Sequence, residues 1–167
     1  MRCYIGIDNG TSGSVGFIRN TVAGYFKTPT KNELSYTKVE KRINRIDAEA
    51  LFSSLTKARE TFNEFDCMVA IERPFVNPQM WTASLSAIRA LEATLCVLER
   101  LHLPYRYIDS KEWQRAMLPS GIVGTDKLKA ASLDVARRIY PQIVSDNPKA
   151  KDMDGLLIAA YLKKTNA

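Results

Sequence analysis

Histidine and cysteine are scarce in this chain of 167 residues, and their scarcity excludes several classes of site. The one histidine, His102, lies just before Pro104, where a structural role fits better than catalysis, so histidine-based catalytic triads lack support. Cys3, Cys67 and Cys96 are too widely spaced for a Cys-x-x-Cys metal site. Because they lie in apolar stretches, we expect three reduced cysteines in the protein core.

Long apolar runs are also missing. No uninterrupted run reaches the roughly 18 residues of a membrane helix, and the N-terminus lacks the pattern of a signal peptide. We therefore expect a cytoplasmic protein without a membrane partner. Lys and Arg outnumber Asp and Glu by 24 to 18, which favours an anionic partner such as nucleic acid, although a merely basic protein is the alternative. The length predicts a single domain over residues 1–167.

Hydrophobic patterns and turn residues predict an α/β protein with a mixed five-stranded sheet flanked by helices. Strands are expected at 3–8, 13–19, 22–28, 67–72 and 105–108. Helices are expected at 47–62, 81–101 and 152–164, with two more beginning at the N-caps Ser110 and Thr125. The basic stretch 27–45 is predicted to be irregular. Antiparallel hairpins followed by helical crossovers allow the strands that end at Asp8 and Glu72 to lie side by side.

Acidic side chains stand at the ends of several of these core elements. Asp8 follows an apolar strand and precedes a glycine-punctuated turn, Glu72 ends a second apolar run, and Asp152 and Asp154 begin an apolar helix. Singly, each has an ordinary explanation: an Asx-turn for Asp8, a solvated strand end for Glu72, and helix capping for the two C-terminal acids. As a set they would repel one another unless divalent cations held them. Two such cations, roughly 3.5–4 Å apart, are suited to phosphodiester cleavage.

These acids lie in motifs that resemble the RuvC family of Holliday junction resolvases, especially its phage-borne members. The motifs are Ile5-Gly6-Ile7-Asp8-Asn9-Gly10-Thr11-Ser12-Gly13, Ile71-Glu72 and Asp154-Gly155-Leu156-Leu157-Ile158-Ala159-Ala160. The resemblance implies an RNase H-like fold, a homodimer, and Mg²⁺, for which Mn²⁺ can substitute. It assigns catalysis and metal binding to Asp8, Glu72 and Asp154. Cellular members carry a fourth acid where this chain has Lys151, so we assign the fourth position to Asp152.

Basic residues form two candidate sets of DNA contacts. One set lies in the basic stretch 27–45 and comprises Lys31, Lys38, Lys41 and Arg42. The other follows from the resemblance to RuvC, whose phosphate-contacting positions correspond loosely to Lys111, Arg115, Lys127 and Lys129. The alternative for each residue is a solvated face without a ligand.

The expected helix 81–101 carries two apolar stripes. One contains Trp81, Leu85, Ile88, Leu91, Leu95 and Leu98, and the other contains Ala83, Ala87, Ala90, Thr94, Val97 and Leu101. One stripe can cover the sheet while the other meets its copy across a two-fold axis. We assign the small-residue stripe to the dimer interface.

The sequence thus predicts a crossover junction endodeoxyribonuclease of DNA recombination and repair. It would bind four-way (Holliday) junctions and related branched DNA as a homodimer and make paired symmetric nicks without a nucleotide cofactor. If phage-borne, it would act in the host cytoplasm. An actin-like or sugar-kinase-type ATP-binding domain is one alternative, but the chain has no Gly-Gly pair and too little length for a second lobe. A non-catalytic DNA-binding module is another.

Overall fold

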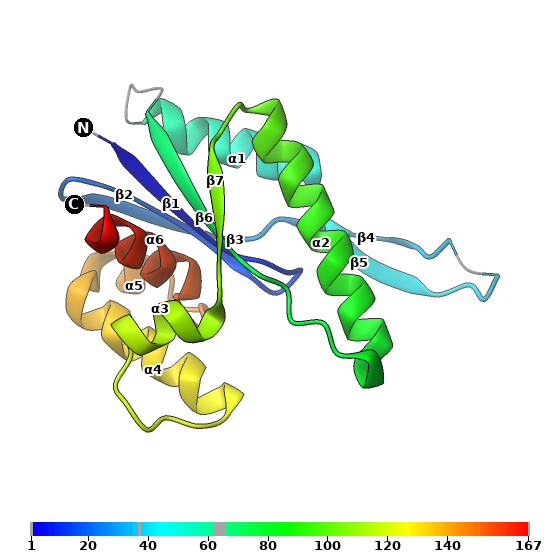
Figure 1. The fold of residues 1–167 in the computed structure, drawn as a ribbon. Coiled ribbons are helices and arrows are strands. Elements are labelled where there is room, and N and C mark those ends of the chain that lie inside the picture. The colour runs from blue at the N-terminus through cyan, green and yellow to red at the C-terminus, as the bar shows by residue number, and fades with distance from the viewer. Residues whose placement is uncertain (1, 37, 62–65, 167) are drawn as a thin grey trace.

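A mixed five-stranded sheet forms the centre of the computed structural model, which describes residues 2–36, 38–61 and 66–166. The strand order is β3-β2-β1-β6-β7, with bounds β1 Cys3–Asp8, β2 Ser14–Arg19, β3 Val22–Lys27, β6 Cys67–Glu72 and β7 Tyr105–Ile108. The first three strands form an antiparallel meander, and β6 and β7 run parallel to β1 (Figure 1). The predicted fold class and the adjacency of the strands ending at Asp8 and Glu72 are confirmed.

Helices cover both faces of this sheet. α1 (Ala48–Glu60) and α2 (Trp81–Arg100) lie on one face, and α3 (Ser110–Met117), α4 (Thr125–Ile139), α5 (Pro141–Asp146) and α6 (Asp154–Thr165) lie on the other (Figure 1). Each face has its own apolar cluster. β1 and β6 are buried almost throughout because they lie between these two layers, which explains their near-continuous apolar sequences.

The helix starts follow local capping chemistry. Asp47 caps α1 as expected, since its Oδ1 accepts a hydrogen bond of 3.1 Å from the backbone N–H of Ala50. The caps predicted at Ser110 and Thr125 are wrong by one residue, because Asp109 and Gly124 occupy the capping positions. The short helix α5 was not expected.

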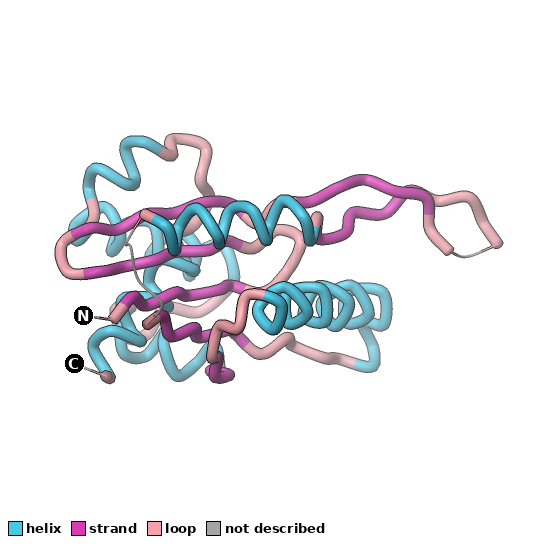
Figure 2. Tube along the Cα trace, turned by 90° about the horizontal axis from the view of Figure 1, so that it is seen from above, coloured by secondary structure: helices cyan, strands magenta, loops and turns pink. Residues whose placement is uncertain are grey.

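The stretch predicted to be irregular is a hairpin. β4 (Thr30–Leu34) and β5 (Arg42–Ile46) form a two-stranded antiparallel sheet that projects away from the body of the protein (Figure 2). Glu33 on β4 accepts from Lys31 at 2.8 Å and from Arg45 at 2.7 Å. Lys31 and Arg45 are directly opposite in the register, so Glu33 compensates a pair of like charges within the hairpin.

The stripe of small residues on α2 that was predicted at a dimer interface is buried from Ala90 onward, so that prediction is wrong for these residues. Ala90 and Thr94, placed at a dimer interface, are each 2% exposed and pack on the sheet. Trp81 and Ile88 from the other stripe are 68% and 45% exposed. Ala90 therefore packs inward, where it joins the apolar cluster that includes residues of β1 and β6. The bulkier stripe is exposed only toward the start of α2, since Leu98 is 0% exposed and Leu91 and Leu95 pack against the same cluster. By length and composition alone the segment Pro78–Arg100 could cross a membrane, but core helices meet the same criterion.

Two smaller expectations concern His102 and the cysteines. His102 has a left-handed backbone (φ 51°) just after α2, and the N–H of Leu103 bonds to the carbonyl of Leu98 at 2.9 Å, so the residue belongs to a helix-ending turn. Cys3 and Cys67 are free and buried, as predicted. Cys96 is exposed, which corrects its assignment to the core.

Candidate metal centre

The topology of the sheet brings two of the predicted acids to one edge. β1 and β6 are parallel neighbours, with Ile7 opposite Ile71, so Asp8 and Glu72 are the last residues of adjacent strands at the same end of the sheet. The buried apolar residues before them fix this register, because a slip by one residue would exchange the two faces of each strand.

Glycines allow α6 to lie directly against these strands. A Cβ on Gly6 would be 2.3 Å from the backbone N of Ala159, and one on Gly16 would be 2.2 Å from Cα of Leu156. On the helix, Gly155 leaves room for β2 and donates its N–H to Ser14 Oγ at 3.1 Å. The absence of these side chains places the first turn of α6, and with it Asp154, beside the end of β1.

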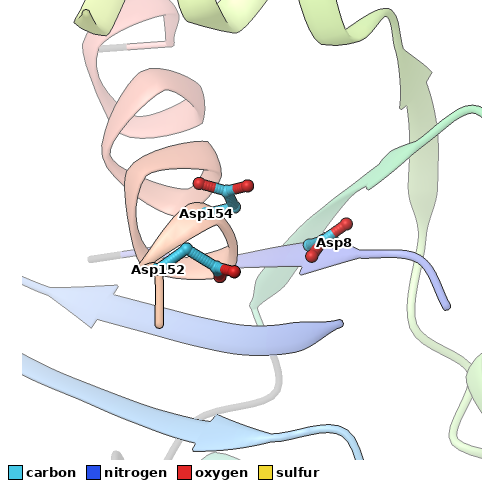
Figure 3. A group of neighbouring side chains, drawn as sticks. All are labelled: Asp8, Asp152 and Asp154. Carbon is cyan, nitrogen blue, oxygen red and sulfur yellow. The ribbon is translucent and has the colours of Figure 1, made fainter. Parts of the chain in front are cut away.

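Asp152 lies in the segment before α6. The helix begins at Asp154 and not at Asp152 as predicted. Because Asp152 lies outside the helix, the two side chains need not point to different faces, and both approach Asp8. Figure 3 shows the three side chains gathered where the end of β1 meets the start of α6. One carboxylate oxygen from each of Asp8, Asp152 and Asp154 lies within 4.8 Å of the others.

Mutual repulsion and burial perturb these carboxyl groups. The pKa of Asp8 is raised well above its ordinary value, first by burial and then by the charges of Glu72, Asp154 and Asp152. Burial likewise raises the pKa of Glu72 to about 7 and that of Asp154 to about 6, with smaller contributions from neighbouring acids. Keeping these carboxylates ionised and close together costs folding free energy unless a cation compensates their charge. Perturbed acids of this kind are typical of functional sites, including metal sites.

The donor set fits a divalent cation. Asp154 Oδ1 is buried and has no hydrogen-bond partner among the described residues, which is the condition expected of an oxygen reserved for a metal. All the candidate ligands are carboxylate oxygens, the donors preferred by Mg²⁺ and Mn²⁺. Glu72 lies outside the group of three that meets within 4.8 Å, although its charge raises the pKa of Asp8. Asp152, which was assigned to the position of the fourth acid, is part of that group of three.

Of the four basic residues predicted on α3 and α4, Lys129 alone contacts an acid of this group in the described structure. Its Nζ lies 2.7 Å from Oδ2 of the buried Asp152, and this hydrogen bond raises the pKa of Lys129. Lys127 is exposed on the same helix. Lys111 and Arg115 line a separate surface hollow at the end of α3.

The four basic residues predicted in the hairpin lie away from the acids. Lys31 is paired with Glu33, and Arg42 donates to Asn32 on the opposite strand. Lys38 and Lys41 are exposed in the turn that joins β4 to β5. The structure therefore separates the predicted basic residues into one beside the acids and several on surfaces further off.

A basic cavity that the sequence did not reveal opens beside Asp152. Its volume is about 580 Å³, and its lysines come from three separate parts of the chain: Lys27, Lys129, Lys149 and Lys151. Tyr25 forms part of its wall and donates to the backbone carbonyl of Asp152 at 3.2 Å. No spacing in the sequence links Lys27 with Lys149, because only the sheet and the loop before α6 bring them together.

Two further polar residues at the acids were also missed. Trp113 on α3 donates its indole N–H to Glu72 Oε2 at 2.6 Å. Ser132 on α4 accepts from the backbone N–H of Met153 at 3.2 Å, and its hydrogen bond to Asp154 lowers the pKa of that acid. Both side chains are fully buried.

The fold resembles solved RuvC structures from Thermus thermophilus. RuvC in complex with a Holliday junction substrate superposes with a TM-score of 0.58 at 14% identity, covering 100% of this chain and 98% of that chain. A second Thermus thermophilus RuvC structure gives a TM-score of 0.53 at 15% identity, covering 98% of this chain and 96% of the other. No protein-family model and no curated protein matches the sequence. At these identities the likeness shows the RNase H-like fold.

Proposed function

We propose that this protein is a metal-dependent, structure-selective endonuclease that resolves four-way DNA junctions by paired, symmetric nicks. One observation carries the proposal: Asp8, Asp152 and Asp154 converge within 4.8 Å on a RuvC-like fold, with Asp154 Oδ1 buried and without a partner in the described chain. The likeness to a RuvC bound to a Holliday junction substrate supports branched DNA as the ligand.

The acids would hold Mg²⁺, for which Mn²⁺ can substitute. Asp8, Asp152 and Asp154 would provide the common ligand group, and Glu72, at the end of the neighbouring strand, would complete the site. Divalent cations in such a site lower the pKa of an attacking water and stabilise the leaving oxygen.

Basic side chains would hold the DNA strand around the acids. Lys129 Nζ is within hydrogen-bond distance of Asp152 and has a side chain 35% exposed, so it can also contact a phosphate beside the acids. Lys27, Lys149 and Lys151 surround the adjoining cavity and have no ion pair among the residues that the structure describes. Further out, Lys38 and Lys41 on the projecting hairpin can contact a DNA arm.

A homodimer would place two such sites at a fixed separation. Large apolar side chains are exposed along the outer face of α2 and the loop before it: Phe75, Val76, Met80, Trp81 and Ile88. A patch of this kind is typical of a protein interface. Because a two-fold axis pairs the same surface of each chain, two copies meeting here would present two equivalent acid clusters, as paired nicks require.

A direct nuclease assay tests the proposal. The wild-type protein should nick a labelled synthetic junction in Mg²⁺ and should nick a linear duplex far less. It should nick neither substrate in EDTA. A fork substrate measures selectivity among branched DNAs. Asp8→Asn should abolish nicking but retain junction binding, because it removes a ligand and a negative charge near the phosphate. Asp134→Asn, at a partly exposed acid on α4, is the matched control. Robust cleavage by Asp8→Asn would contradict the proposed site.

The two alternative functions fit the structure less well than a nuclease does. The ATP-binding alternative requires a second lobe, whereas the described chain builds one five-stranded sheet and a separate hairpin. A non-catalytic DNA-binding module has no use for a buried acid cluster. The phage-type assignment and the cytoplasmic location stay predictions.

A further inference from the structure

We propose that Trp113 is a positioning residue for the metal site. Its indole N–H holds one oxygen of Glu72, which orients this carboxylate toward the cation that the three aspartates bind. The inference rests on the metal centre of the proposed function and assigns a role to a residue that touches neither metal nor DNA.

The first support is the hydrogen bond. Trp113 Nε1 lies 2.6 Å from Glu72 Oε2, which is a short hydrogen bond. Glu72 is the last residue of β6. An indole N–H can donate a hydrogen bond but cannot bind a cation. It therefore holds one oxygen of Glu72 without acting as a metal ligand itself. Glu72 Oε1 is thereby left for the metal.

The second support is the rigidity of the donor. Trp113 is 0% exposed and belongs to the apolar cluster that includes Ile108 and Leu156. Its helix, α3, is tied to α6 by a hydrogen bond of 2.6 Å from the Tyr161 hydroxyl to Glu112 Oε1. Since α6 also carries Asp154, Trp113 fixes Glu72 relative to an acid on a different element.

The third support is that Glu72 requires such a partner. It is the last residue of β6, and the segment that follows has no regular structure until Pro78. Asp8 and Asp154 carry like charges nearby and would favour rotation of this flexible side chain away from them. The hydrogen bond from Trp113 opposes that rotation. Partners that orient metal ligands in this way typically change metal affinity by about 10–100-fold.

The chain provides its own spectroscopic probe, because it contains two tryptophans in different environments. Trp113 is buried against Glu72, whereas Trp81 is 68% exposed at the start of α2. The experiment titrates Mg²⁺ into ¹⁵N-labelled wild-type protein and follows both indole N–H signals, assigned from Trp113→Phe and Trp81→Phe. The Trp113 signal should shift with saturation, the Trp81 signal should stay, and Glu72→Gln should suppress the Trp113 response.

A second measurement compares affinities. Trp113→Phe retains an aromatic ring but removes the donor, so its apparent Kd for Mg²⁺, taken from the metal-induced rise in Tm, should increase by about tenfold or more. Trp81→Phe should keep the wild-type Kd. A role in packing alone would lower the Tm of Trp113→Phe without changing its affinity for Mg²⁺.

The outcomes separate this inference from the proposed function. A Trp113 signal that ignores Mg²⁺ while Mg²⁺ still raises the wild-type Tm overturns the inference alone, even if Trp113→Phe does not fold. No response of the wild type to Mg²⁺ by either method refutes both. A responsive Trp113 signal in a protein that leaves junctions intact supports the positioning role and refutes the nuclease.

Discussion

Neutralising Glu72 should stabilise the metal-free protein while destroying the site. Glu72 is mostly buried, and burial together with the charge of Asp154 raises its pKa from 4.5 to about 7. Glu72→Gln removes the charge but keeps an oxygen that can accept from the Trp113 indole. We therefore expect a higher Tm for this variant in EDTA at neutral to alkaline pH.

The magnitude follows from the pKa. A carboxyl group moved from 4.5 to about 7 by folding disfavours the folded, ionised state by roughly 3 kcal/mol. Rearrangement of neighbouring side chains and the burial of an amide reduce the gain, so we expect about 1–3 kcal/mol, or roughly 2–12 °C in Tm for a chain of this length.

The sign depends on pH in a definite way. Folding raises the pKa of Glu72, so below its unfolded pKa the protonated side chain does not lower the free energy of unfolding. That stability is lost as pH rises through the folded pKa, because the buried side chain then ionises. The advantage of Glu72→Gln over wild type should therefore grow from near zero at about pH 4 to its full size at about pH 8.

Thermal unfolding in EDTA across this pH range checks the prediction. Asp134→Asn serves as the control, since Asp134 lies on α4 with a side chain 48% exposed and is paired with Arg138 at 2.6 Å. Equal Tm values for wild type and Glu72→Gln at pH 8 would refute the reasoning, as would an advantage that persists unchanged at pH 4. With saturating Mg²⁺ the order should reverse, because the wild type alone retains every ligand.

Three further predictions concern other parts of the molecule. Reversing Lys38 and Lys41 to Glu should weaken junction binding and reduce the slope of log affinity against log salt by about 0.9 for each lost phosphate contact; an unchanged slope would make the hairpin tip a solvated face. Ile88→Glu should give a folded monomer in sedimentation experiments that no longer linearises a cruciform plasmid, and a persistent dimer would exclude the outer face of α2. Gly6→Ala should lower stability by about 1–3 kcal/mol, because its Cβ would meet the backbone of α6. Gly24→Ala should cost less, since it meets the movable ring of Phe17, and equal losses in denaturant titrations would argue against the close approach.

The sequence predicted the elements whose patterns are local and unambiguous. Strands β1 and β6 were identified because apolar runs lead into Asp8 and Glu72, and their pairing followed from the order of hairpins and crossovers. The hairpin β4–β5 was missed because its many basic residues were interpreted as an irregular stretch, and the pairing of Lys31 with Arg45 across Glu33 is visible only in the folded hairpin.

The acids that gather at the end of β1 and Lys129 beside them were predicted, but the other residues around them were not. Asp152 reaches the cluster because the helix starts two residues later than its pattern suggested, a boundary that packing against glycines determines. Periodicity found two apolar faces on α2 but could not say which side chains pack inward, as Ala90 does. The hydrogen bonds of Trp113 to Glu72 and of Met153 to Ser132 join elements far apart in the chain, so local patterns do not predict them.

The docking of α6 on β1 and β2 also sets an order in time. Asp8 and Glu72 are synthesised early, whereas Asp152 and Asp154 emerge from the ribosome only after all five strands of the main sheet. The contact between Gly155 and Ser14 spans 141 residues, so it cannot form before nearly the whole chain has been synthesised. Until then the acids are dispersed along an incomplete chain, so a nascent or truncated form lacks the acid cluster. Cleavage competence would thus report that folding is complete.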